Sequence, residues 1–338
     1  MLAFGQAVKT IEGCTSNDIP KHLLTATEPF ILKGLAADWP LVQAGLNSTA
    51  EADKYIRQFY QGQQVGAFVG EPEIKGRFGY NQDMTGFNYQ TVRADLTQVL
   101  DKIQQNLDNP SAQSCYVGST SVDLCLPGLR QTNDLALDVP NKPLVSVWIS
   151  NRSRISAHFD LPDNIAVNAV GKRRFTLFPP DQLENLYVGP LEFNPAGQAI
   201  SLVDFHQPDF ARFPKFKTAM ENAWVAELEP GDAVFVPSMW WHHVESLTGF
   251  NVLVNYWWRQ SPNFMETPAG ALTYAQMTIR DLPEAQKQAW KNLFDYYVFS
   301  DRERAAAHIP EHCQASVGKM TADIIRRLRG IVLNRLNR

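Results

Sequence analysis

Short runs of β-branched and aromatic residues dominate the middle of the chain. Gly, Pro and Asn residues separate these runs, which is typical of a β-barrel or jelly roll. Strands are predicted at residues 115–117, 145–149, 165–167, 175–178, 225–228, 233–236 and 251–257. Two further strands, at 29–33 and 65–69, precede them. The pattern therefore predicts a mainly β fold for the central part of the chain.

Helical patterns flank this segment on both sides. Ser48 and Glu51 have the spacing of a capping box, and apolar spacing predicts a second helix over 91–107. After residue 262 the composition shifts to helix formers, with helices predicted over 269–279, 282–299, 301–307 and 317–336. We therefore predict a β domain with an N-terminal α/β flank over residues 1–262 and a helical region over 263–338.

Composition and charge narrow the possible functions. With 338 residues, of which 44% are hydrophobic and 20% charged, the chain can bury a large core. The net charge of −4 argues against an extended nucleic-acid surface, which normally needs a basic face. The arginines between Arg326 and Arg335 are interpreted as the solvated face of an amphipathic helix. No run of eighteen apolar residues is present, so no membrane segment is predicted.

The cysteines carry no sign of a metal-binding or disulfide framework. No Cys-x-x-Cys pair occurs among the four of them, Cys14, Cys115, Cys125 and Cys313. Scattered cysteines of this kind are typical of reduced thiols, and no N-terminal export signal precedes them. We therefore expect a cytoplasmic protein.

The tripeptide His158-Phe159-Asp160 is the first candidate for chemistry. Residues i and i+2 share one face of a strand, so His158 and Asp160 are expected to project side by side. Far downstream, a Pro-Gly-Asp turn and the apolar run 233–236 lead to the adjacent pair His242 and His243. One histidine from that pair would complete two imidazoles and one carboxylate. This set occupies one face of Fe(II) and leaves three positions open for chemistry.

Several further motifs follow in one order along the chain. They are the run Gly171-Lys172-Arg173-Arg174 that leads into Phe175, then Val203-Asp204-Phe205, Pro230-Gly231-Asp232 and Trp240-Trp241-His242-His243. With His-x-Asp, this order over roughly residues 110–260 resembles the JmjC family of cupin-like proteins. It is most similar to the branch that contains the asparaginyl hydroxylase inhibiting hypoxia-inducible factor. The resemblance implies a double-stranded β-helix that uses Fe(II), 2-oxoglutarate and O2 to hydroxylate a C–H bond.

The resemblance also implies roles for individual residues. The metal ligands would be His158, Asp160 and, directly after the two tryptophans, His242 rather than His243. The residues implied to hold 2-oxoglutarate or line its pocket are Tyr116, Asn164, Arg173, Asn255 and Trp257. Alternation along a strand predicts that Arg173 faces inward, opposite to its two basic neighbours.

Two positions depart from the family pattern at the cosubstrate. Arg173 stands where the hydroxylase has Lys, and the two side chains are not interchangeable at a bidentate carboxylate site. Ile155 stands where relatives carry Thr, which removes one hydrogen-bond donor. Both changes bear on whether 2-oxoglutarate binds.

A third departure concerns the substrate. Ala199 and Ile200 replace the polar pair with which the hydroxylase recognises its target, so asparagine hydroxylation is not expected. We predict hydroxylation of a protein or peptide side chain, with a small molecule or modified nucleoside as alternatives. Two other classes stay open: a Zn or Mn cupin with non-oxidative chemistry, and a binding module that has lost turnover. Histone demethylation is disfavoured.

The last predicted helix carries an apolar stripe that needs a partner face. The stripe consists of Ile325, Leu328, Val332 and Leu336. Either the flank of the β domain or a second copy of the chain could cover it. Because similar hydroxylases dimerise through C-terminal helices, we predict a homodimer.

Overall fold

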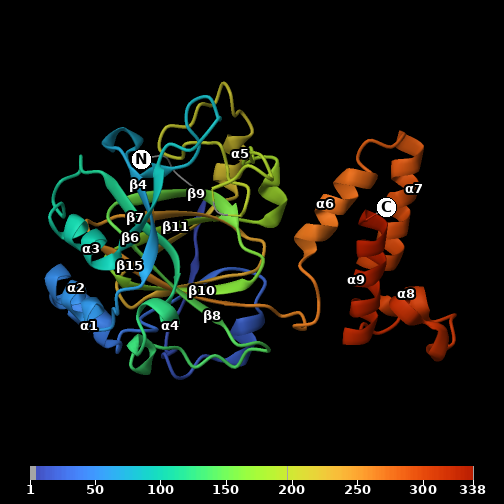
Figure 1. Ribbon diagram of the computed structural model, residues 1–338, viewed down its shortest axis with the longest axis horizontal. Helices are drawn as coiled ribbons and strands as arrows, with labels where there is room; N and C mark the ends of the chain where they lie inside the picture. Colours follow the sequence, from blue (N-terminus) through green and yellow to red (C-terminus); the bar gives the residue numbers. More distant parts are fainter. Residues whose placement is uncertain (1–4, 196, 338) are drawn as a thin grey trace. The chain divides into compact units, whose positions relative to one another are not determined.

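The computed structural model describes residues 5–195 and 197–337. The chain divides into two compact units, residues 1–260 and residues 261–338 (Figure 1). Residues 1–4, Ala196 and Arg338, which the predicted regions include, lie outside the described residues. Among the described helices, none combines the length and the apolar character that crossing a bilayer requires.

The first unit contains two β-sheets. The six-stranded sheet has the order β1 (Gln6–Ala7), β12 (Trp224–Leu228), β11 (Arg173–Phe178), β14 (Trp241–Ser246), β9 (Ser153–Phe159) and β5 (Arg77–Phe78). The nine-stranded sheet has the order β2 (Lys9–Ile11), β3 (Phe30–Leu32), β13 (Ala233–Val236), β10 (Asp163–Val170), β15 (Asn251–Trp258), β8 (Leu144–Ser150), β7 (Ser114–Ser121), β4 (Gln64–Gly70) and β6 (Gln90–Asp95). From β8 to β11 and again from β12 to β15, successive strands alternate between the two sheets, as in a jelly roll.

Apolar side chains fill three layers around these sheets. One cluster lies between the sheets and includes Phe175, Leu177 and Val234. A larger cluster lies under the helices α1 (Pro40–Asn47), α2 (Thr49–Arg57), α3 (Leu96–Gln104) and α4 (Val122–Cys125), on the outer side of the nine-stranded sheet (Figure 1). A third packs α5 (Phe216–Glu221) onto the six-stranded sheet. The double layer is thereby fixed from both sides.

The predicted mainly β jelly roll with a C-terminal helical region is confirmed. Each predicted strand overlaps an observed one, and Ser48 caps α2 by accepting a hydrogen bond from the backbone N–H of Glu51. The helix predicted over 91–107 is wrong in its first part, where residues 90–95 form β6 and pair with β4. The helix begins only after Asp95, whose carboxylate accepts from the N–H of Thr97. Pairing with β4 here outweighs the helical spacing of the apolar residues.

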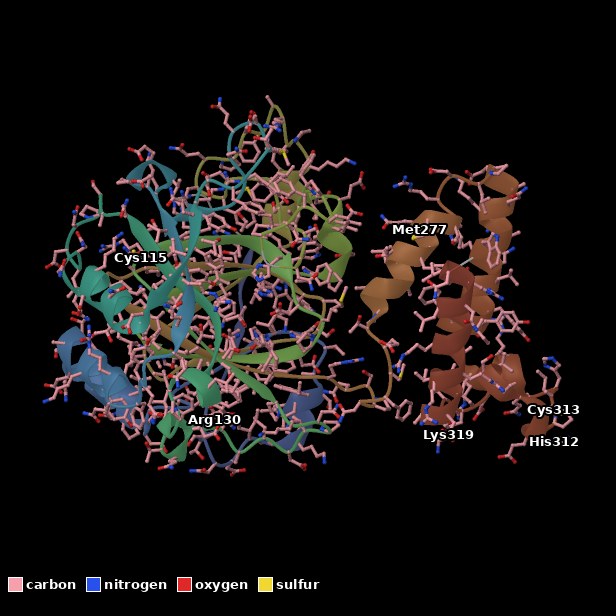
Figure 2. All side chains as sticks on the ribbon, in the orientation of Figure 1. Cys115, Arg130, Met277, His312, Cys313 and Lys319 are labelled. Carbon is pink, nitrogen blue, oxygen red and sulfur yellow. The ribbon has the colours of Figure 1, made fainter. Side chains whose placement is uncertain are left out.

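The second unit is helical throughout. Its helices are α6 (Pro268–Thr278), α7 (Glu284–Phe294), α8 (Arg302–Ala306) and α9 (Ala322–Leu336), with a π-helical turn at Asp295–Phe299. Thr321 starts α9 by accepting from the N–H of Ile324, so this helix begins later than the predicted residue 317. Most large apolar side chains that the described chain exposes belong to this unit, including Met277 (Figure 2). Its helices therefore present unusual apolar surface to their surroundings.

The buried ring of Phe235 provides a test of the packing. This side chain is fully buried on β13 and stacks on Phe30, with ring centroids 4.9 Å apart. Phe235→Ala should lower the free energy of unfolding by about 3–5 kcal/mol, because it leaves a cavity in the core. Urea denaturation measures the change. Leu46→Ala, at a side chain that is 57% exposed on α1, should change the value by less than about 0.5 kcal/mol. Equal effects would contradict the described packing.

Candidate metal centre

Two neighbouring strands bring the candidate metal-binding histidines together. In the pairing of β9 with β14, His158 lies directly opposite His242, and their ring centroids are 4.3 Å apart. The register shifts next to this pair. The next paired residues, Ile155 and Val244, are three positions from His158 on β9 but only two positions from His242 on β14. Such a bulge re-aims side chains beside many active sites. Here it lets both Ile155 and His158 face the interior.

Backbone carbonyl groups fix the orientation of both imidazoles. The Nδ1 atom of His158 lies 3.0 Å from the carbonyl oxygen of Ser156, and Nδ1 of His242 lies 3.0 Å from that of Trp240. A carbonyl oxygen only accepts, so each Nδ1 carries the proton and each Nε2 presents a lone pair. Burial, followed by the nearby His158, lowers the pKa of His242 to about 4. Its ring is therefore neutral near pH 7, as a metal ligand must be.

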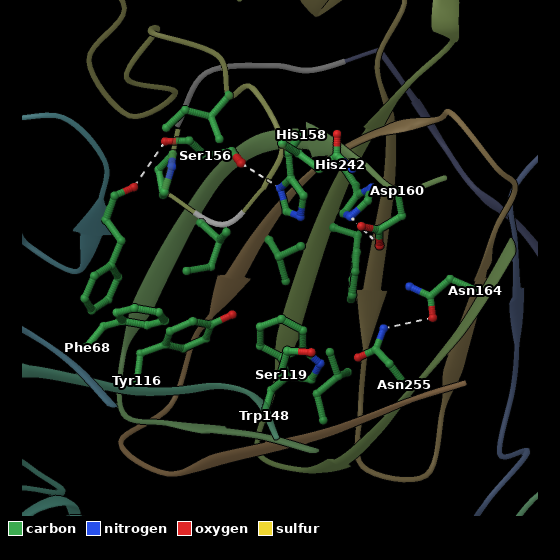
Figure 3. Close-up of a pocket in the computed structure, with 18 of the residues that line it drawn as sticks. Phe68, Tyr116, Ser119, Trp148, Ser156, His158, Asp160, Asn164, His242 and Asn255 are labelled. Carbon is green, nitrogen blue, oxygen red and sulfur yellow. Dashed lines mark hydrogen bonds and ion pairs between the residues drawn. The ribbon is translucent and has the colours of Figure 1, made fainter. Parts of the chain in front are cut away.

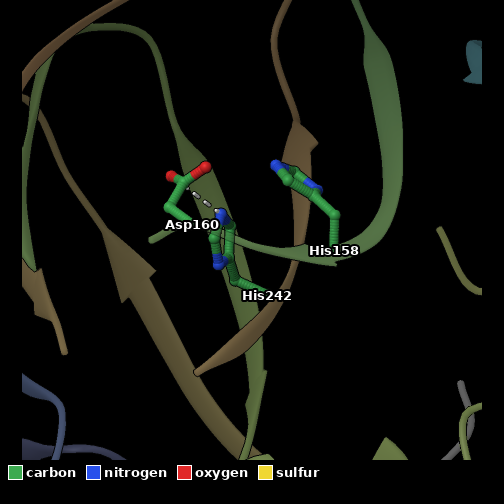
Figure 4. A group of neighbouring side chains, drawn as sticks. All are labelled: His158, Asp160 and His242. Carbon is green, nitrogen blue, oxygen red and sulfur yellow. Dashed lines mark ion pairs between the residues drawn. The ribbon is translucent and has the colours of Figure 1, made fainter. Parts of the chain in front are cut away.

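The carboxylate of Asp160 completes the group (Figure 4). The potential ligand atoms of His158, Asp160 and His242 all lie within 4.8 Å of one another, and Asp160 Oδ2 is 3.6 Å from His242 Nε2. The indole Nε1 of Trp257 donates a hydrogen bond of 3.1 Å to Asp160 Oδ2. A partner of this kind orients a ligating carboxylate. Two imidazoles and one carboxylate at this spacing fit a divalent metal with open coordination positions.

The three side chains open onto a cavity of about 260 Å³ between the two sheets (Figure 3). All eight residues predicted for the site line this cavity. They come from six different stretches of the chain, and the fold brings all eight together.

Arg173 lies on the inward face of β11. A two-residue turn at Gly171 and Lys172 precedes it, and Gly171 has a φ of 79° there. Arg173 is 3% exposed, and its Nε and Nη2 groups have no hydrogen-bond partner in the part of the chain that the structure describes. Burial lowers its pKa to about 10, and Tyr116 acts in the opposite direction. The guanidinium thus stays charged at neutral pH and presents unused donors to the cavity. Its neighbour Arg174 instead donates to Glu227 on the outer face.

The remaining predicted residues lie around the same cavity. Burial raises the pKa of Tyr116, while Arg173 opposes this shift, so the phenol keeps its proton near neutral pH. The amide of Asn255 donates to Asn164 Oδ1 at 2.8 Å, which leaves the buried Oδ1 of Asn255 without a partner among the described residues. An unmatched polar atom in a buried site is costly unless a ligand or water satisfies it.

His243 points away from this cavity. Its ring lies 4.4 Å from that of Phe205, centroid to centroid, beneath the segment that covers the outer face of the six-stranded sheet. Burial lowers the pKa of His243 to about 4, so this ring is also neutral. Adjacent residues on a strand face opposite ways, which explains why only His242 meets His158 and Asp160.

Sequence reasoning missed the aromatic wall of the cavity. Phe68 stacks on Tyr116 at 5.8 Å and meets Tyr89 edge-on at 5.2 Å, while Trp148 packs 5.6 Å from Tyr116 (Figure 3). Phe68 lies within a predicted strand, but strand periodicity does not reveal which strand will be its neighbour. Only the order β8-β7-β4-β6 brings these rings together.

A histidine–carboxylate–histidine group inside a jelly roll defines the cupin class of protein. Residues 16–264 match the family described as "Cupin-like domain". That match covers most of the chain, and the chain belongs to the cupin-like domain family.

Three relatives of known name are similar to the chain. HSPB1-associated protein 1 of Homo sapiens is 25% identical over 308 residues, which is 85% of this chain and 59% of that protein. tRNA wybutosine-synthesizing protein 5 of Danio rerio is 33% identical over 106 residues, 31% of this chain and 29% of that protein. Lysine-specific demethylase JMJ31 of Arabidopsis thaliana is 28% identical over 126 residues, 37% of this chain and 22% of that protein. The chain thus spans less than two thirds of each of these relatives.

The two adjacent histidines give a matched test of the metal centre. His242→Ala should lower the affinity for Fe(II), measured by anaerobic isothermal titration, by more than about a hundredfold. Loss of a direct ligand exceeds the effect of losing a ligand's hydrogen-bond partner, which is about 10–100-fold. His243→Phe should bind Fe(II) nearly as well as the original protein, because His243 faces Phe205. The choice of His242 would be wrong if His243→Phe lost the metal and His242→Ala kept it.

Proposed function

We propose that the protein is an Fe(II)- and 2-oxoglutarate-dependent dioxygenase that hydroxylates a C–H bond of a protein or peptide side chain. The observation that carries the proposal is a buried, charged Arg173 with two unused N–H groups in the same cavity as His158, Asp160 and His242. A buried cation needs an anion, and a planar guanidinium suits a carboxylate. A dicarboxylate that also reaches the metal satisfies both requirements.

The chain's own residues have distinct parts in this proposal. His158, Asp160 and His242 would hold the metal, which with 2-oxoglutarate and O2 supplies the oxidation of a C–H bond. Arg173 would bind the distal carboxylate by charge-assisted hydrogen bonds, with the Tyr116 hydroxyl beside it. Trp257 keeps Asp160 in place, and Asn164 with Asn255 offers amide groups to the bound molecule. Of the two departures from the family pattern, Arg173 would keep the positive charge for the cosubstrate, whereas Ile155 lines the cavity without the hydrogen-bond donor that relatives have there.

The aromatic wall has a part of its own. Phe68 and Phe78 pack against Tyr116 with ring centroids 5.8 and 5.6 Å from it, and Tyr89 packs edge-on against both phenylalanines. Burial raises the pKa of Tyr89 to about 12. Packed rings exclude water from one side of the cavity. A dry site strengthens the ion pair at Arg173 and protects reactive species from side reactions.

The comparisons support the substrate class only indirectly. HSPB1-associated protein 1 aligns with most of this chain, and its name denotes association with another protein. A tRNA-modifying relative aligns with a shorter segment, which keeps a modified nucleoside or another small molecule as the alternative within the same mechanism. The finer relationship to the asparaginyl hydroxylase, and a cytoplasmic location inferred from the four free cysteines, belong to this proposal as well.

We also propose that two copies associate through the C-terminal unit. On α9, Ile325 and Leu328 are half-buried, whereas Val332, Leu333 and Leu336 are 42–52% exposed. Phe299, after α7, is 75% exposed. Apolar surface of this extent on short helices is typical of a subunit interface. Residues 263–338 would then serve as the dimerisation region and residues 1–262 as the catalytic domain.

Arg173 provides the test of the cosubstrate. Arg173→Met removes the charge at similar length and should weaken 2-oxoglutarate binding by at least about thirtyfold, since truncating one partner of a buried charge pair costs about 2–5 kcal/mol. The affinity of Arg173→Lys for 2-oxoglutarate should lie between those of the original protein and Arg173→Met. Anaerobic titration of the Fe(II) protein measures the affinity through the visible absorption that metal chelation produces. Arg174→Met is the matched control, because its guanidinium pairs with Glu227 outside the cavity.

The same titration separates the competing classes. A protein that binds Fe(II) but shows no absorption change with 2-oxoglutarate would be a cupin of non-oxidative chemistry or a binding module without turnover. Absorption together with conversion of 2-oxoglutarate to succinate supports the oxygenase. Equal loss of binding in Arg173→Met and Arg174→Met would contradict the assignment of the cosubstrate to Arg173.

The dimer has a separate test. Sedimentation equilibrium should give twice the 38.1 kDa mass of one chain. Leu333→Glu combined with Leu336→Glu should give the single mass, because two charges would have to be buried in the interface. Arg327→Glu, an exposed position on the same helix, should leave the dimer intact. A monomeric original protein, or a dimer that survives the double substitution, would overturn this interface.

A further inference from the structure

The cavity beside the candidate metal centre contains few charges. Among the described side chains that line it, Asp160 is the only carboxylate and Arg173 the only guanidinium, and none is a lysine. Besides the two candidate metal-binding imidazoles, the other lining groups are aromatic, aliphatic, hydroxyl or amide. Both charges are used in the proposed function, Asp160 by the metal and Arg173 by the cosubstrate. A substrate group that enters this cavity therefore meets no free counter-ion.

Nearby arginines do not supply one either. Arg77 donates to the carbonyl oxygen of Leu202, and Arg154 pairs with Asp204 at 2.9 Å. Neither arginine lines the cavity. Their partners lie in the segment that covers the outer face of the six-stranded sheet. Both arginines therefore interact on that outer face and not in the cavity. An ionised substrate side chain would lose its hydration without compensation.

The aromatic residues do not form a cage for a cation. Tyr89 meets Phe68 and Phe78 edge-on, at interplanar angles of 77° and 65°, and the ring centroids are 5.2 and 5.4 Å apart. A cation held between ring faces lies up to about 6 Å from each centroid and needs rings that stand apart. These rings are in direct contact with one another. They provide an apolar wall and leave no slot for an alkylammonium group.

Ile200 is the residue best placed to select what enters. The backbone N–H of the next residue, Ser201, donates to the carbonyl oxygen of Ala157 at 2.8 Å, so Ile200 lies beside the strand that carries His158. A Cβ atom built on Gly79 would lie 3.8 Å from Ile200 Cδ1, which places this side chain over the glycine. Ile200 is 6% exposed and lines the cavity, with the half-buried Gln198 two residues away.

We infer that the group oxidised in this site is an uncharged, apolar side chain of the leucine, isoleucine, valine or phenylalanine type, and that Ile200 is a specificity-determining residue. The inference rests on the proposed function, because it assigns the two charges of the cavity to the metal and the cosubstrate. It deepens that function by excluding lysine, arginine, aspartate and glutamate as targets.

Two probes of nearly the same shape test this inference. N-acetyl-leucine methylamide and N-acetyl-aspartate methylamide differ mainly in the charge of the side chain. Saturation-transfer NMR on the full chain, loaded with redox-inert Zn(II) and 2-oxoglutarate, measures the affinity of each probe. The leucine probe should bind at least about tenfold more tightly than the aspartate probe, because the cavity offers no cation to a second carboxylate. Ile200→Arg should reverse this preference, because the new guanidinium supplies a cation for the carboxylate of the aspartate probe.

Further variants guard against misfolding and against a general effect of added charge. Gln198→Arg places the same charge at a less buried position of the cavity and should also favour the aspartate probe. Leu46→Arg, on the surface helix α1, should keep the original preference. Retention of Zn(II)-dependent 2-oxoglutarate binding shows that each variant is folded.

The outcomes distinguish this inference from the function on which it rests. If the original protein binds no 2-oxoglutarate, the proposed function fails and the inference fails with it. If 2-oxoglutarate binds but the aspartate probe binds equally well or better, or neither probe binds, only the inference is overturned. The same holds if both arginine variants keep the original preference.

Discussion

The pairing of β9 with β14 is the interaction on which the candidate site depends. It places His158 opposite His242 at a spacing that the backbone hydrogen bonds of the sheet set, without help from the cavity. Each ring then donates from Nδ1 to a carbonyl group two residues earlier in the chain. Both imidazoles are thus preorganised by main-chain geometry, which is stiffer than side-chain contacts. The lone pair on each Nε2 is left available to a metal.

Arg173 differs from the two imidazoles because its buried polar groups lack partners. Arg173 is held in place by the strand that carries it, yet it has unused N–H groups in a region of low polarity. Such a residue opposes folding, since burial of an unpaired charge costs several kcal/mol. Under the proposed function, the distal carboxylate of 2-oxoglutarate would offset this cost. The unpaired Arg173 would thus lower the stability of the unliganded protein and raise its affinity for the cosubstrate.

Much of this arrangement could be predicted because it depends on strand alternation. The rule that i and i+2 share a face placed His158 beside Asp160, and it separated the inward Arg173 from the outward Arg174. The same rule fails across the bulge in β9, where Ile155 and His158 face the interior although they are three residues apart. A bulge arises from the fit between two strands, which periodicity within one strand does not contain.

Other features depended on contacts between distant parts of the chain. The aromatic wall forms because β4 and β7 are neighbours, and no local pattern assigns Phe68 to that wall. Likewise, the spacing of Val92 and Leu96 is compatible with a helix, but pairing with β4 converts the first of them to strand. The resemblance to a family supplied the distal residues, such as Asn255, that spacing alone would have left without a role.

The candidate metal ligands and the proposed specificity-determining residue lie on different kinds of structure. The metal-binding group and Arg173 lie on or directly beside paired strands of the jelly roll, where a shift of one residue would disturb the core. Gln198 and Ile200 lie instead in the connection between β11 and α5, which is joined to β9 near His158 through the hydrogen bond from Ser201 to Ala157. Connections tolerate change far better than paired strands. Substitutions in this connection can therefore change the lining of the cavity while the paired strands keep the histidine–carboxylate–histidine group in place.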